Sequence, residues 1–167
     1  MKLSKNLTLA EVAKSATADR RGIDNTPKGK HLENLKLIAE EVFQPLRDHF
    51  KKPIAVTSGY RSAQLNQLIG GAGYWQSGRY IPASQHCYGQ ALDIDGDMTG
   101  VDNAKIFEYI KDNLEFDQLI WEFGDDKKPA WVHVSYKAEG NRGEILVAKK
   151  NSKGRTYYET YKDELAD

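Results

Sequence analysis

The chain has 167 residues, with 24 basic side chains, 24 acidic side chains and one cysteine, Cys87. Because domains most often run to ~100–150 residues, we expect a single domain over residues 1–167. The balanced charge gives no reason to expect nucleic acid or an anionic membrane as a partner. A lone cysteine excludes an internal disulfide. The fold must therefore be stabilised by packing or by a bound metal ion.

The first 22 residues begin with basic side chains, but polar residues interrupt every apolar run before a signal-peptide core forms. No later stretch approaches the ~18 apolar residues of a membrane span. We therefore expect a soluble monomer that is made in the cytoplasm without a signal peptide.

Helices dominate the first part of the chain. Thr8 and Glu11 form the pattern of a capping box, which predicts a short helix to about Ala18. Apolar residues at three- and four-residue steps then predict the main helix within residues 25–53, with Pro45 as a candidate kink. The same spacing predicts further helices within residues 62–71 and 103–114.

Strands dominate the second part. Short runs with strand character cover residues 53–58, 90–96, 117–123, 131–136 and 144–150. Residues 72–84 are rich in glycine and aromatic side chains without a clear period, which predicts a long exposed loop, and a polar tail is expected from about residue 150. Helices first and strands later predict an α+β domain, in which N-terminal helices flank a small antiparallel sheet.

Two of the four histidines lie in strand-like, aromatic-rich surroundings. His86 precedes Asp93 by seven residues, and His133 lies in a later predicted strand. Zinc accepts imidazole nitrogen and carboxylate oxygen, and catalytic zinc uses three protein ligands with a fourth position left for water. Gly89 would let the chain bend between the first two ligands. The pattern alone leaves a metal site and hydrogen-bonded core histidines as alternatives, whereas His31 and His49 are expected to be solvated or capping residues at the ends of the main helix.

Four sequence segments resemble the zinc D-alanyl-D-alanine metallopeptidases: "SGYRS" at 58–62, "LN" at 65–66, "SQHCYGQALDID" at 84–95 and "WVHVSY" at 131–136. They occur in the family's order, and the resemblance runs from about residue 7 to residue 136. It implies the hedgehog/D-Ala-D-Ala peptidase-like fold, with one zinc ion bound by His86, Asp93 and His133.

The sequence departs from the family pattern at the general base. Many members have an acidic residue three positions before the last histidine ligand, where this chain has Ala130. If residues 117–123 and 131–136 form a hairpin, Glu122 faces the metal when it pairs with Trp131 or His133. We therefore expect Glu122 to be the catalytic base. The alternatives are a surface glutamate at this position, or a base provided by one of the other acidic residues, Asp95, Asp125 or Asp126.

The resemblance places Arg61 as the ligand of the substrate carboxylate, which a guanidinium can bind through two hydrogen bonds. Ser84, Gln64 and Asn66 are expected to add hydrogen bonds to the substrate. Three aromatic residues of the glycine-rich segment either form a wall of the cleft or simply pack, namely Tyr74, Trp75 and Tyr80.

The resemblance implies zinc-dependent hydrolysis of bonds in peptidoglycan stem peptides, with D-Ala-D-Ala carboxypeptidase activity as the first expectation. An L-Ala-D-Glu-type endopeptidase, as in phage endolysins, is one alternative. A non-catalytic zinc-containing module that binds peptidoglycan, for example in a phage particle, is another, and a Cys87–His133 nucleophilic pair is a weaker one. For a chain without an export signal, release by phage lysis machinery is a route to the cell wall.

Overall fold

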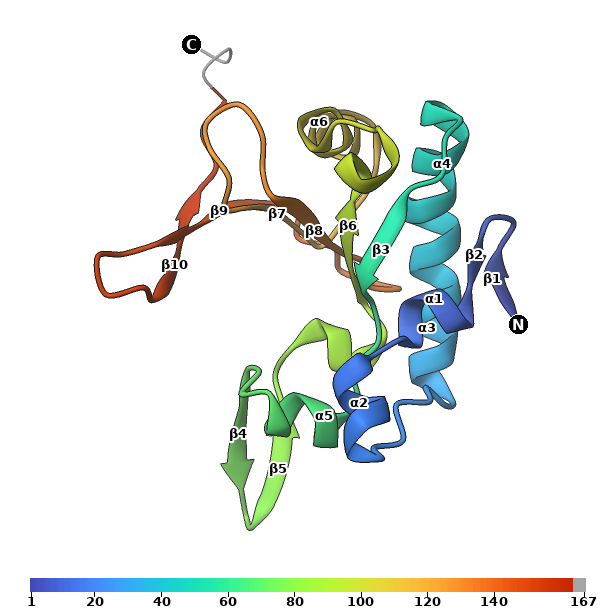
Figure 1. Cartoon of the computed structure of the whole chain (residues 1–167), viewed down its shortest axis with the longest axis vertical. Helices are drawn as coiled ribbons and strands as arrows, with labels where there is room; N and C mark the ends of the chain where they lie inside the picture. Colours follow the sequence, from blue (N-terminus) through green and yellow to red (C-terminus); the bar gives the residue numbers. More distant parts are fainter. Residues whose placement is uncertain (164–167) are drawn as a thin grey trace.

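The computed structural model describes residues 1–163 and has the predicted α+β architecture, built around one six-stranded sheet (Figure 1). The strand order is β10-β9-β7-β8-β6-β3. The strands are β3 (Ala55–Ser58), β6 (Ala91–Asp95), β7 (Gln118–Glu122), β8 (Trp131–Ser135), β9 (Glu144–Lys150) and β10 (Thr156–Thr160). All neighbouring pairs are antiparallel except β7 and β9. The expected antiparallel sheet is therefore present except at this pair, where the chain leaves β8 and crosses to the far edge of β7.

A continuous helical segment over residues 30–50 packs on one face of this sheet, as the apolar spacing predicts. It comprises α3 (Lys30–Ile38), a π-helical turn η1 (Ala39–Phe43) and α4 (Gln44–Phe50). The wide turn directly precedes Pro45, whose ring and missing amide hydrogen do not fit a regular helix interior. α6 (Asn103–Asn113) lies beside this segment (Figure 1). None of the helices in the described part of the chain combines the length and hydrophobicity needed to cross a bilayer.

The sheet has one apolar and one polar face, because successive side chains of a strand point to opposite sides. The apolar face contributes to the core beneath the helices through Leu92, Ile94, Leu119, Trp121, Val132 and Val134. Residues between these positions point away from the helices, and they include Asp93, Glu122 and His133. The alternation that builds the core therefore also gathers the candidate site residues on the opposite face.

Smaller elements complete the fold and carry most of the departures from the prediction. The capping box at Thr8 is present, but the helix it starts ends early, since Ser15 caps a second one. These elements are the ribbon β1 (Lys2–Ser4) and β2 (Leu7–Thr8), α1 (Leu9–Ala13), α2 (Ala16–Arg21), α5 (Ala63–Leu68), β4 (Gly73–Gln76), β5 (Arg79–Pro82), and the 3₁₀ turns η2 (Gln85–Tyr88) and η3 (Gly96–Thr99).

Two hairpins replace segments that were expected to lack structure. The predicted loop at residues 72–84 is the exposed hairpin β4–β5, and the expected polar tail contains β10, which pairs with β9. Both hairpins project from the body of the molecule (Figure 1). The side chains of β4 and β10 are exposed, and those of β5 are exposed or half-buried, so these three strands lack the buried–exposed alternation on which the prediction depended. Residues 164–167 of the expected tail lie outside the described part.

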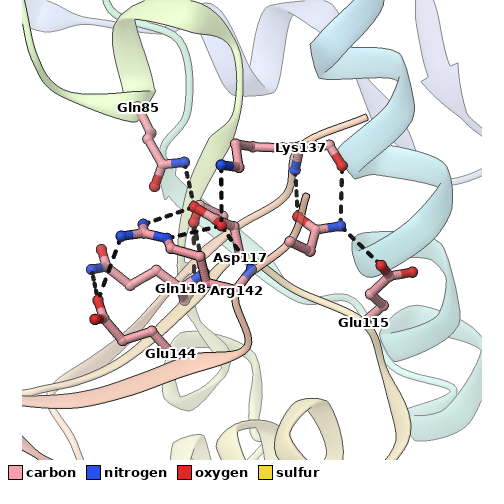
Figure 2. A network of polar contacts seen from close by, with 9 residues as sticks. Gln85, Glu115, Asp117, Gln118, Lys137, Arg142 and Glu144 are labelled. Carbon is pink, nitrogen blue, oxygen red and sulfur yellow. Dashed lines mark hydrogen bonds and ion pairs between the residues drawn. The ribbon is translucent and has the colours of Figure 1, made fainter. Parts of the chain in front are cut away.

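A buried carboxylate fastens the start of β7 to two neighbouring segments (Figure 2). Asp117 is fully buried and accepts hydrogen bonds from the Arg142 guanidinium, at 3.1 Å from Nε and 2.8 Å from Nη2. Gln85 Nε2 donates to the same carboxylate at 2.9 Å, and Lys137 Nζ lies 3.6 Å away. Burial alone raises the pKa of Asp117, but the hydrogen bonds from Arg142 outweigh it and hold the pKa well below its ordinary value.

Replacement Asp117→Asn should destabilise the fold at neutral pH by on the order of 1–3 kcal/mol, the cost of losing hydrogen bonds to a charged group. Because the folded-state pKa lies below the ordinary value of about 3.9, this contribution is present above that value and is lost as the pH falls below it. The measurement is urea unfolding of parent and variant between about pH 7, where the contribution is complete, and about pH 2, where it is partly lost. A difference that stays constant down to the lowest pH would contradict the assignment. Asp112→Asn, which removes an exposed partner of Lys111, is the control and should change stability by less than about 1 kcal/mol.

Candidate metal centre

Three side chains from separate elements converge on the polar face of the sheet. Asp93 lies on β6 and is paired directly with His133 on β8, and directly opposed residues of an antiparallel pair project to the same face. His86 comes from η2, the turn before β6. This turn ends at Gly89, whose φ is +70° and whose missing side chain avoids overlap with the carbonyl oxygen of His31. The bend expected at this glycine is therefore present.

The Asp93 carboxylate lies between the two imidazoles. One oxygen is 2.9 Å from His133 Nδ1, and the other is 3.5 Å from His86 Nε2. Burial alone raises the pKa of Asp93, but the neighbouring His133 and His86 imidazoles hold that pKa well below the ordinary value. Burial lowers the pKa of His133. Both shifts favour an ionised aspartate and a neutral imidazole, which are the protonation states that bind a metal.

The second ring nitrogen of His86 is held by the backbone. Its Nδ1 lies 2.7 Å from the Gly59 carbonyl oxygen, to which only a protonated nitrogen can donate. The hydrogen bond therefore leaves Nε2 unprotonated and directed toward Asp93, an arrangement typical of histidine ligands.

The three residues meet the requirements of a zinc site. One ligand atom from each lies within 4.8 Å of the other two. Two ligands of a tetrahedral zinc ion, each about 2.1 Å from the metal, are about 3.4 Å apart, which is close to the separations of 2.9 Å and 3.5 Å in this group. Two imidazoles and one carboxylate also form a donor set that zinc accepts, with a fourth position left for water.

Glu122 lies at the end of β7 on the same face. It is paired with Trp131, the pairing expected from the sequence, and its carbonyl accepts a hydrogen bond from the Ala130 amide at 2.9 Å. Within residues 1–163 no hydrogen bond reaches its carboxylate, although the residue is only 8% exposed. Burial, and then the negative charge of Asp93, raises the pKa of Glu122 to about 7. The backbone of Glu122 is thus hydrogen-bonded to Ala130, the position at which the family pattern has an acidic residue.

These side chains line a cleft of about 600 Å³. Arg61 and Ser84 lie in its wall together with the His86–Asp93–His133 group and Glu122. The Ser84 hydroxyl accepts a hydrogen bond from the His86 amide at 3.3 Å, so it also shapes the turn that carries this histidine. Arg61 Nη1 donates to Asn66 Oδ1 at 3.0 Å.

Two expected substrate contacts are not brought to the cleft. Gln64 is exposed on α5 and lies outside the cleft lining. Asn66 is fully buried, and its side chain is bonded to other parts of the protein. Helical spacing alone could not predict which side chains of α5 face the cleft, because the sequence does not show which segments pack against this helix.

The cleft also contains residues that the sequence prediction missed. Thr156 and Tyr158 reach it from β10, and Arg142 from the segment before β9. The turn "NSKG" at 151–154, closed by a 2.9 Å hydrogen bond from the Gly154 amide to the Asn151 carbonyl, separates two runs with strand character. It was the available signal for this hairpin. The hairpin β4–β5 contributes through Ala72 and Ala83 at its base, while Trp75 is 65% exposed.

The remaining histidines and the cysteine do not form a second centre. His31 is partly buried and packs against Tyr60 and Tyr88, and no side chain of the described residues caps the start of α3, so His31 is neither fully solvated nor a capping residue. His49 is exposed and stacks on Tyr109. Cys87 is buried, and this burial raises the pKa of its thiol to about 11. A protonated, buried thiol is a poor nucleophile, which removes the physical basis of a Cys87–His133 pair.

Comparison with known proteins agrees with this geometry. A search of curated proteins finds no match. The family model described as Peptidase M15 matches residues 5–135, a range that includes η2, β6, β7 and β8 and therefore every element of the metal group. The resemblance found in the sequence motifs is thus confirmed over most of the chain. The protein belongs to the peptidase M15 family of zinc-dependent metallopeptidases.

Proposed function

We propose that this metallopeptidase hydrolyses peptide bonds in bacterial peptidoglycan stem peptides, as a D-Ala-D-Ala carboxypeptidase. The observation that carries the proposal is the convergence, in one cleft, of the His86–Asp93–His133 group, the buried Glu122 carboxylate and the Arg61 guanidinium. The first group suits one zinc ion, Glu122 suits proton transfer, and Arg61 suits an anionic peptide terminus.

Each residue has a distinct task in the proposed reaction. His86, Asp93 and His133 would hold the zinc ion, which when bound would supply a water with a pKa of about 7 and polarise the scissile carbonyl. Glu122 accepts a proton from the attacking water and delivers it to the leaving amine nitrogen, for which a pKa of about 7 is suitable. Arg61 holds the terminal carboxylate and thereby fixes which bond lies beside the zinc ligands.

Endopeptidase activity of the L-Ala-D-Glu type is a second candidate, and one observation favours it. Arg61 also lines another cavity of about 440 Å³, which runs along β3 and includes Leu65, Ile69 and Met98. A peptide that continues beyond Arg61 would have room there, whereas a carboxypeptidase needs no such space.

The other alternative, a non-catalytic module, rested on the missing acid at position 130. The position of Glu122 beside Ala130 supports catalysis instead.

The purified protein should bind about one zinc ion, and His86→Ala, Asp93→Ala and His133→Ala should each weaken its retention, since each removes one of three protein ligands. Elemental analysis after dialysis against a weak chelator measures this retention. His49→Ala, which changes an exposed histidine outside the cleft, should retain the parent zinc content. Full occupancy in all three ligand variants would eliminate the proposed site.

Replacement Glu122→Gln should retain zinc and the fold while hydrolysis falls by about 10²–10⁴-fold, the usual contribution of a general acid–base group. Asp125→Asn is the matched control, because Asp125 is exposed and caps a turn, and it should react at the parent rate. The measurement is steady-state hydrolysis with zinc content determined on the same samples. Parent-like activity of Glu122→Gln would assign proton transfer to another group.

The two candidate activities differ in their need for a free terminus. For a carboxypeptidase, amidation of the terminal D-Ala should reduce kcat/KM of the parent by about 10–100-fold, as expected for a lost charge-assisted hydrogen-bond pair. Arg61→Lys, which keeps the charge but loses the planar fork, should show a smaller penalty for amidation. Equal hydrolysis of acid and amide by the parent would instead favour the endopeptidase.

A further inference from the structure

The Asn66 side chain is held at three points although the sequence pattern suggests a substrate ligand. It is fully buried, and its Oδ1 accepts the hydrogen bond from Arg61 Nη1 at 3.0 Å. Its Nδ2 donates to the Ala72 carbonyl at 3.0 Å and to the Tyr80 hydroxyl at 2.7 Å. Both amide donors are therefore used, and the amide joins α5 to the β4–β5 hairpin while it orients the guanidinium.

The space for this contact depends on Gly71. A Cβ at this position would overlap Asn66 Oδ1 and would lie 2.9 Å from Arg61 Nη1. A Cβ at Gly73 would likewise overlap the Tyr80 hydroxyl. The Arg61–Asn66 and Asn66–Tyr80 hydrogen bonds therefore each lie against a glycine, at which a side chain would displace one of the bonded groups.

The charge of Arg61 is left uncompensated by this arrangement. The two arginines in the cleft lining differ in this respect. Arg142 is paired with the Asp117 carboxylate through two nitrogens, whereas within residues 1–163 no carboxylate forms an ion pair with Arg61. A neutral amide can fix the direction of a guanidinium without cancelling its charge, which a carboxylate at the same position would do.

We infer that Asn66 is the positioning residue that holds Arg61 as a receptor for a substrate carboxylate, so that the enzyme selects peptides with a free carboxylate near the scissile bond. Asn66 itself contacts no substrate, because it is fully buried. The inference rests on the proposed peptidase function and extends it, since it assigns the selection between acid and neutral peptides to a buried amide behind Arg61.

The test compares Asn66→Asp and Asn66→Ala with the parent zinc enzyme, using acetyl-D-alanyl-D-alanine and its C-terminal amide as probes. In Asn66→Asp the introduced carboxylate is nearly isosteric and pairs with Arg61, so affinity for the acid should fall about tenfold or more while affinity for the amide stays within about twofold. Asn66→Ala should also weaken binding of the acid selectively. Gln67→Ala, at an exposed position of α5, is the control and should match the parent.

Calorimetric binding and steady-state kinetics provide two readouts. The selective loss should raise KM for the acid with little change in kcat, because Arg61 acts on binding. Equal losses for acid and amide in Asn66→Asp would overturn the inference and make Asn66 merely structural. If the parent hydrolyses no peptide, the proposed function fails, but the binding comparison still decides the role of Asn66.

A third measurement covers the case in which Asn66→Ala folds poorly. The guanidinium NMR signal of Arg61, assigned by its absence in Arg61→Lys, should be dispersed in the parent and should shift in Asn66→Asp. In Tyr80→Phe, which keeps the Arg61–Asn66 hydrogen bond, a smaller shift is expected. An unchanged Arg61 signal in Asn66→Asp would contradict the contact and with it the inference.

Discussion

The antiparallel pairing of β6 with β8 is the constraint on which the rest of the site depends. It places Asp93 directly opposite His133, and the same pairing places Leu92 opposite Val134 in the core. A one-residue slip would turn the two candidate metal ligands toward the helices and the core residues toward solvent. Formation of the core therefore fixes the position of two of the three candidate ligands, and the charge of the half-buried Asp93 carboxylate is compensated by its contact with His133 Nδ1 at 2.9 Å.

Outside this pair, each functional group is positioned by a different segment and by a different kind of interaction. A backbone carbonyl orients His86, a buried amide orients Arg61, and burial beside Asp93 raises the pKa of Glu122. Asp117 connects this set to the frame of the sheet, because it binds Gln85 in the turn that carries His86. The cleft lining also includes Ala72 and Ala83 at the base of the β4–β5 hairpin, and Thr156 and Tyr158 of β10.

The sequence was sufficient to predict those helices and strands whose apolar residues recur at regular spacing and are buried on one face. The main helix and the central strands were predicted because their apolar residues repeat at helical or alternating spacing, and the same alternation predicted that Glu122 faces the ligand side. The β4–β5 hairpin and β10 escaped prediction because their strands show no such alternation between buried and exposed side chains. The orientation of the Asn66 side chain could not be predicted either, because its partners Ala72 and Tyr80 belong to the segment that was expected to be a loop.

The central claim is that the His86–Asp93–His133 group, Glu122 and Arg61 together form a zinc peptidase site for peptidoglycan stem peptides. The most direct measurement is digestion of purified muropeptides by the parent protein, with mass analysis of the products, before and after treatment with a chelator and again after zinc is restored. The account predicts loss of one terminal D-Ala, its disappearance with the chelator and its return with zinc. Product formation that persists in the chelated protein, or no product with zinc present, would contradict it.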